Sequence, residues 1–109
     1  MEYDISSITD KMAEDKVAEV ARRGDDLEQE VEIIDGMDKA IVGTCVNEYG
    51  NIVAVYDREL CIQCIMESMS ESDDPEDDPY ESAMEFFEYN TVRSLPYRKD
   101  RAPIIIELL

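Results

Sequence analysis

Two of the three cysteines, Cys61 and Cys64, have the CxxC spacing that occurs in redox pairs and in zinc sites. Redox chemistry needs a stabilised thiolate, which a helix N-terminus or nearby cations provide. Here Cys61 is expected one turn inside a helix, beside the acids Asp57, Glu59 and Glu67. A zinc site normally takes four Cys or His ligands, and the chain has three cysteines and no histidine. The pair is therefore interpreted as two small core residues, with a thiol or metal protein as the alternative.

The most polar stretch is the carboxylate run from Ser70 to Asp78. Clustered carboxylates can bind calcium, but the run lacks the central glycine and terminal glutamate of an EF-hand loop, and Pro75 and Pro79 restrict how its carboxylates converge. No pair of carboxylates stands out as an acid and a base, and the chain has no histidine, no glycine-rich phosphate loop and no nucleophile elbow. The sequence therefore predicts a protein that is not an enzyme and that uses no metal or cofactor.

The net charge of the chain restricts the kinds of molecule that it can bind. The 28 acidic and 10 basic residues give a formal net charge of −18, which repels nucleic acid and anionic membranes. No apolar stretch approaches the roughly 18 residues that span a bilayer, and the N-terminus lacks the features of a secretion signal. We expect a cytoplasmic protein that binds neither nucleic acid nor membrane directly.

Carboxylates on rigid helices can imitate the phosphates of a DNA duplex, so one hypothesis is a DNA mimic that inhibits a nucleic-acid-binding protein. The candidate contact residues are Asp25, Asp26, Glu28, Glu30, Glu71, Asp73, Asp74, Glu76, Asp77 and Asp78. The alternative is an acidic surface that serves only solubility. A basic segment near the C-terminus could pair with the body of its own chain or with a second copy, so a homodimer stays open. This segment is Tyr97-Arg98-Lys99-Asp100-Arg101.

Four helices are expected to position these residues. Ser7 with Asp10 resembles a capping box and predicts a helix from Ser7 to Arg23, ended by Gly24. Leu27, Val31 and Ile34 at i, i+4 and i+7 predict a second helix from Asp25 to Asp35. Asp57 can cap a third, largely apolar helix that contains both cysteines of the CxxC pair. Asp78, Pro79 and Glu81 predict the start of a fourth helix, Pro79 to Val92, in which Phe86 and Tyr89 widen the apolar face.

Strands are expected at Ala40 to Val46 and at Ile52 to Tyr56, because both are rich in β-branched residues and are separated by a hairpin-like loop. The apolar run that begins at Ile104 predicts a last strand. The expected fold is one α+β domain over residues 1–109, in the order α-α-β-β-α-α-β. It combines an antiparallel hairpin and a C-terminal strand with packed helices.

The stretches Tyr56–Ile62 and Tyr80–Thr91, together with Ala102-Pro103-Ile104, resemble a group of small uncharacterised proteins of tailed bacteriophages, which share a "YDREKCI…LM" helix and a "YEEA-EFFEYN" helix. The resemblance covers about half of the chain, and this sequence departs from the group by its acidic run at residues 70–78. It implies a phage-encoded cytoplasmic protein and brings no known activity. The combined hypothesis is a non-enzymatic module that binds a host or phage protein, such as a nucleic-acid-binding or defence protein of the infected bacterium. A structural or housekeeping phage protein is a further alternative.

Overall fold

A computed structural model describes residues 5–68 and 79–108 of the chain. Its helices and strands are α1 Asp10–Asp26, β1 Ile41–Val46, β2 Ile52–Asp57, α2 Arg58–Ser68, α3 Pro79–Phe86 and β3 Ile104–Ile106. Short 3-10 helices lie at Ile5–Ser7 and Asp38–Ala40, and a π-helical turn lies at Phe87–Thr91. A longer 3-10 segment, Val92–Arg101, is interrupted at Lys99, which has a φ of 57°. The predicted α+β class is confirmed.

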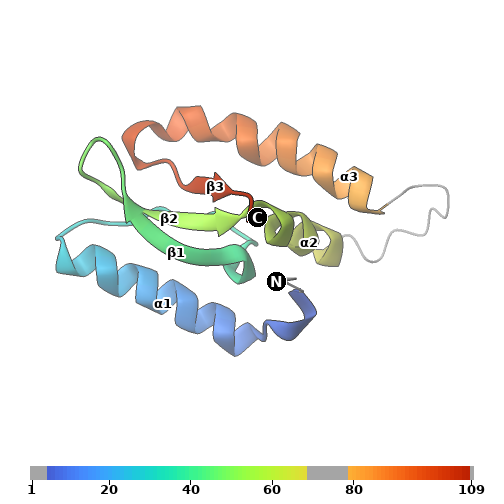
Figure 1. Cartoon of the computed structure of the whole chain (residues 1–109), viewed down its shortest axis with the longest axis horizontal. Coiled ribbons are helices and arrows are strands. Elements are labelled where there is room, and N and C mark those ends of the chain that lie inside the picture. Colours follow the sequence, from blue (N-terminus) through green and yellow to red (C-terminus); the bar gives the residue numbers. More distant parts are fainter. Residues whose placement is uncertain (1–4, 69–78, 109) are drawn as a thin grey trace.

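The sheet has the order β1-β2-β3, with β1 antiparallel and β3 parallel to β2. In Figure 1 it lies between α1 and α3, while α2 continues directly from the end of β2. The central strand β2 is apolar and buried along almost its whole length, as expected for a strand that is covered on both faces. Tyr56, Leu60, Ile62 and Phe87 are among the largest fully buried side chains.

The start of α2 follows the prediction. The Asp57 carboxylate accepts a hydrogen bond from the backbone N–H of Glu59 at 3.3 Å, so this aspartate caps the helix at the point where the strand ends. Leu60, Cys61 and Ile62 are completely buried, as expected for a helix that is apolar around most of its circumference.

The first helix, α1, begins three residues later than predicted, at Asp10, and ends three residues later, at Asp26. Its N-cap is Thr9, whose hydroxyl accepts from the N–H of Met12 at 3.1 Å, and so the Ser7 capping box is wrong. Gly24 does not end the helix but lies buried within it. A Cβ at that position would lie 2.7 Å from the carbonyl oxygen of Gln29, so the glycine permits a close approach of the following chain.

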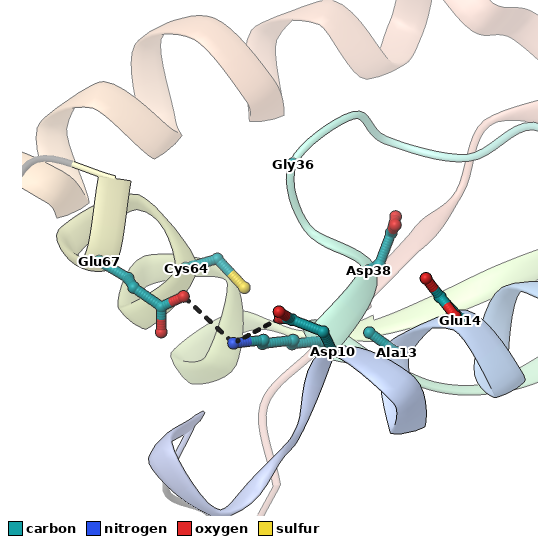
Figure 2. A pocket seen from close by; sticks show the side chains of 8 residues that line it. Asp10, Ala13, Glu14, Gly36, Asp38, Cys64 and Glu67 are labelled. Atoms are coloured by element: carbon teal, nitrogen blue, oxygen red, sulfur yellow. Dashed lines mark hydrogen bonds and ion pairs between the residues drawn. The ribbon is translucent and has the colours of Figure 1, made fainter.

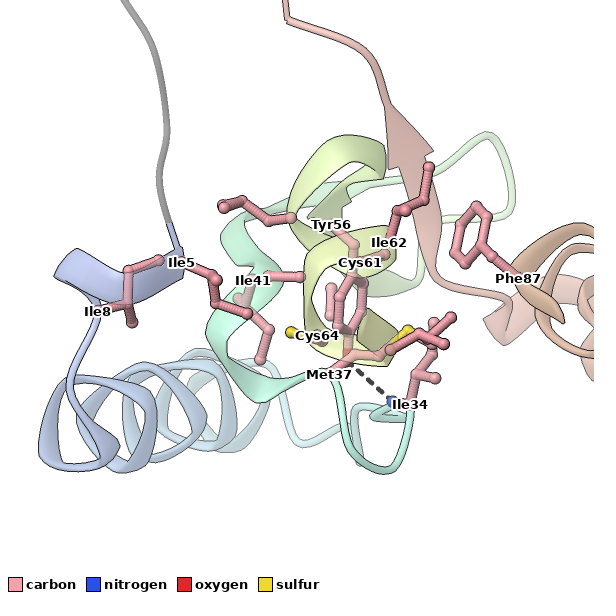
Figure 3. Close-up of a cluster of buried hydrophobic side chains, with 14 of the residues drawn as sticks. Ile5, Ile8, Ile34, Met37, Ile41, Tyr56, Cys61, Ile62, Cys64 and Phe87 are labelled. Atoms are coloured by element: carbon pink, nitrogen blue, oxygen red, sulfur yellow. Dashed lines mark hydrogen bonds between the residues drawn. The ribbon is translucent and has the colours of Figure 1, made fainter. Parts of the chain in front are cut away.

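The second predicted helix, Asp25 to Asp35, is wrong after Asp26. Glu28 adopts a left-handed conformation with φ 56°, and the N–H of Gln29 donates to Gly24 O at 2.8 Å, which closes a Schellman-type helix end. The chain then runs without helical structure to Ile34, whose N–H donates to the Tyr56 hydroxyl at 2.8 Å (Figure 3). Since an apolar spacing cannot distinguish a helix from an irregular segment packed on a sheet, tertiary contacts decide this segment.

The fourth helix begins at Pro79, as predicted, but α-helical geometry ends at Phe86 and a π-helical turn follows. In the described parts of the chain, no helix is long and apolar enough to cross a membrane.

Candidate protein-interaction surface

Four of the predicted contact residues, Asp25, Asp26, Glu28 and Glu30, are exposed at the C-terminal end of α1 and in the turn that follows. The structure therefore places them together on one small part of the surface. The other six lie outside the described residues: Glu71, Asp73, Asp74, Glu76, Asp77 and Asp78.

The turn that carries these four acids is fixed to the β-hairpin by the side chain of Gln29. Its carbonyl oxygen accepts from the N–H of Ile52 at 2.9 Å, and its amide nitrogen donates to Gly50 O at 3.2 Å. With the Schellman-type bonds at Glu28, these contacts hold the backbone on both sides of Gln29. The acidic turn is therefore positioned by the sheet as well as by the helix.

The negative charge is concentrated in two segments of the sequence. Residues 25–38, the first acidic segment, contain seven carboxylates and no Lys or Arg. Residues 67–88, the second acidic segment, contain ten carboxylates and again no Lys or Arg. The rest of the chain is nearly balanced. A count of charges in successive windows of the sequence would have found both segments.

Helix α1 itself is a poor imitation of a duplex. It carries six carboxylates and four Lys or Arg residues, whereas a duplex of the same length, roughly 25 Å, carries about 15 phosphates. Arg22 contacts Glu19 at 2.6 Å and Asp26 at 3.0 Å, and Arg23 contacts Glu19 at 3.1 Å. Hydrogen bonds from Arg22 and Arg23 lower the pKa of Glu19 to about 2. The candidate surface is therefore limited to the two acidic segments.

A hollow of about 380 Å³ lies where α1, α2 and the Asp38–Ala40 turn meet (Figure 2). Lys39 reaches across it and contacts Glu67 at 3.1 Å and Asp10 at 3.5 Å. The hydrogen bond with Glu67 is the main cause that raises the pKa of Lys39. This lysine therefore ties the start of α1 to the last turn of α2, the helix that leads into the second acidic segment.

The CxxC cysteines belong to the core. Cys61 is fully buried and Cys64 is 8% exposed, both among aliphatic and aromatic side chains (Figure 3). Burial raises the pKa of the Cys61 thiol to about 12 and that of Cys64 to about 11. A thiol with so high a pKa is not ionised near neutral pH and is a weak nucleophile. Among residues 5–68 and 79–108, no group of His, Cys, Asp or Glu side chains is arranged to hold a metal ion.

The basic segment near the C-terminus is fastened to its own chain. Arg98 contacts Glu32 at 3.4 Å, and the Asp100 carbonyl accepts hydrogen bonds from the side-chain amides of Asn47 and Asn51 at 2.6 and 3.2 Å. Of the two expected contacts of this segment, the structure thus contains the one with the body of its own chain.

No family model, no curated protein and no solved structure matches this chain.

Proposed function

We propose that this chain is a non-enzymatic, phage-encoded module that inserts its two acidic segments into a cationic site of a host protein, in the place of nucleic acid. The observation that carries the proposal is the separation of charge along the sequence. The two segments hold 17 of the 28 carboxylates and none of the 10 basic residues. A surface of this kind attracts a partner whose own site is positively charged, and proteins that bind DNA or RNA have such sites.

The ion pairs of the fold leave much of the first acidic segment unneutralised. Glu32 pairs with Arg98, but Asp25, Glu28 and Glu30 make no ion pair with any residue that the structure describes. These three side chains are exposed and stand on a turn that Gln29 clamps to the hairpin. Because the turn is already ordered, a partner would bind it without a large loss of conformational entropy.

The test is capture of partners from bacterial lysate on the immobilised chain. Two variants remove carboxylates by amide substitution: D25N/E28Q/E30Q in the first segment, and E71Q/D73N/D74N/E76Q/D77N/D78N in the second. The matched control E14Q/D15N/E48Q changes three exposed acids outside both segments. We expect a nucleic-acid-binding protein that the wild type and the control capture, that the two variants lose, and that added DNA displaces. Equal capture by all forms, or a partner that DNA does not displace, would contradict mimicry and favour a merely solubilising or structural role.

The thiol alternative is tested by titrating cysteines in the folded chain at pH 8. Burial of Cys61 and Cys64 favours the binding function, and we expect only the half-buried Cys45 to react readily. Reaction of all three cysteines at similar rates in the folded chain would instead support a thiol protein built on the CxxC pair.

A further inference from the structure

The outer face of α3 and of the π-helical turn carries exposed aromatic side chains. Phe86 is 49% exposed and Tyr89 is 67% exposed, so the expectation that they widen the buried face of this helix is wrong. The buried face consists of Ala83, Phe87 and Thr91. In Figure 1 this helical segment lies along the outside of the molecule, on the side of the sheet away from α1.

The π-helical turn, Phe87–Thr91, lies in the middle of this face. In a π-helix the hydrogen bonds run from i to i+5, so a turn contains more residues and side chains four apart lie nearly in line. On the buried side this aligns Phe87 with Thr91. On the outer side, Glu85 in α3, Tyr89 in the π-helical turn and Arg93 at the start of the following 3-10 helix are four residues apart in the sequence, and all three are exposed. The Arg93 guanidinium lies 4.5 Å from the centre of the Tyr89 ring, which orders both side chains.

The charges along this face reverse at Tyr89. Between Pro79 and Glu88 the chain has three carboxylates and no basic residue, whereas Val92–Arg101 has four basic residues and one carboxylate. Glu85 lies four residues before Tyr89 and Arg93 lies four residues after it. If two such helices lie antiparallel with the Tyr89 rings opposite each other, each Glu85 therefore faces the Arg93 of the other copy. A surface that is complementary to itself in this way suits a twofold, isologous contact.

We propose that two copies of this chain associate through the face formed by Glu85, Phe86, Tyr89 and Arg93. A twofold axis passes beside Tyr89, the aromatic rings of the two copies pack together at the centre, and a Glu85–Arg93 pair closes each side. Aromatic residues and arginine are the types that dominate the binding energy of protein interfaces. A single pair of helices makes a small contact and the two copies repel each other, so we expect a dissociation constant in the micromolar range or weaker. Glu85 also belongs to the second acidic segment, but the contact is argued from the charges on either side of Tyr89 and does not rest on the function proposed for that segment.

Reversal of the charges tests the contact. Sedimentation equilibrium of the full chain, from micromolar to millimolar concentration in buffer of physiological ionic strength, gives the dissociation constant of each form. E85R places two arginines opposite each other at each side, and R93E places two glutamates there. We expect each single variant to weaken the dimer about tenfold or more, because like charges opposite each other are repulsive. The double variant E85R/R93E restores the pairs with their sides exchanged, and its dissociation constant should return to within about threefold of that of the wild type.

The controls E48R and K11E make the same changes of charge on exposed residues of the hairpin loop and of α1, and they should not weaken the dimer. Y89A should abolish it. Circular dichroism of every form checks that the fold is kept. A wild type that stays monomeric at millimolar concentration would overturn the proposal. So would a double variant that is as weak as the single ones, because a contact with a different partner surface would not be restored by exchanging the two charges.

Discussion

The hydrogen bond between Tyr56 and Ile34 leads to a quantitative prediction for the variant Tyr56→Phe. The Tyr56 side chain is completely buried, and its hydroxyl oxygen accepts from the Ile34 N–H at 2.8 Å. Phenylalanine fills the same space, so packing is kept and only the acceptor is lost. The same burial raises the pKa of Tyr56 to about 12, so the hydroxyl is un-ionised over the usual pH range.

The magnitude follows from leaving the Ile34 N–H without its acceptor in a buried site. An unsatisfied buried donor costs about 1–3 kcal/mol. For a chain of 109 residues, 1 kcal/mol lowers the Tm by roughly 4 °C, so Y56F should lower it by about 4–12 °C. If residues 25–35 were the helix that the apolar spacing predicts, the Ile34 N–H would donate within that helix and the substitution would cost little.

The assay is urea unfolding followed by circular dichroism, with Tyr49→Phe as the matched control. Tyr49 is 65% exposed and lies in the hairpin loop, so Y49F should leave the free energy of unfolding within about 0.5 kcal/mol of that of the wild type. A Y56F variant as stable as Y49F would refute the assignment of this hydrogen bond and of the non-helical segment that it anchors.

Three further substitutions test how the elements are held. Gly24→Ala brings a methyl group against Gln29 O and Val31, and the overpacking should lower the free energy of unfolding by about 1–3 kcal/mol, more than the gain in helix propensity from alanine. In the control Gly43→Ala the added methyl group meets nothing within 4 Å, so the stability should change little. A higher Tm for G24A than for the wild type would contradict the close approach at Gly24. Asp57→Ala removes the cap of α2 and should cost about 1–2 kcal/mol in urea unfolding, while Asp57→Asn keeps an acceptor. Burial raises the pKa of Asp57 above the ordinary aspartate value of 3.8, so the wild type loses stability as the pH rises above that value and the carboxyl ionises. The stability of D57N relative to the wild type should therefore increase from pH 4 to pH 7. A difference in stability that does not change with pH would contradict the raised pKa. Lys39→Met leaves Asp10 and Glu67 facing each other without a cation, so it should lower the free energy of unfolding, and by less in high salt. A cost that does not change with salt would argue against an electrostatic role.

Local chemistry was sufficient to predict several elements. The hairpin, the cap at Asp57, the apolar helix that follows it, the helix start at Pro79 and the last strand at Ile104 are all found in the structure. Each of these depends on residues close together in the chain: β-branched runs, a capping carboxylate, or a proline whose fixed φ suits a first helical turn. The burial of Cys61 and Cys64 also follows from the continuous apolar arc of their helix.

The candidate surface was predictable in composition but not in arrangement. The order of the residues alone shows that the negative charge lies in two segments free of basic residues, and that Glu85 and Arg93 flank Tyr89 at equal spacing. Two features depend on the folded chain. The turn that carries Glu28 and Glu30 is fixed to the hairpin, and Phe86 and Tyr89 face outward. Apolar spacing cannot say whether a face of a helix is covered, because that depends on segments far away in the chain. Here the burial of Phe87 and Thr91 turns Phe86 and Tyr89 toward solvent, and the hydrogen bond from the Ile34 N–H to Tyr56 holds residues 27–34 in a non-helical conformation.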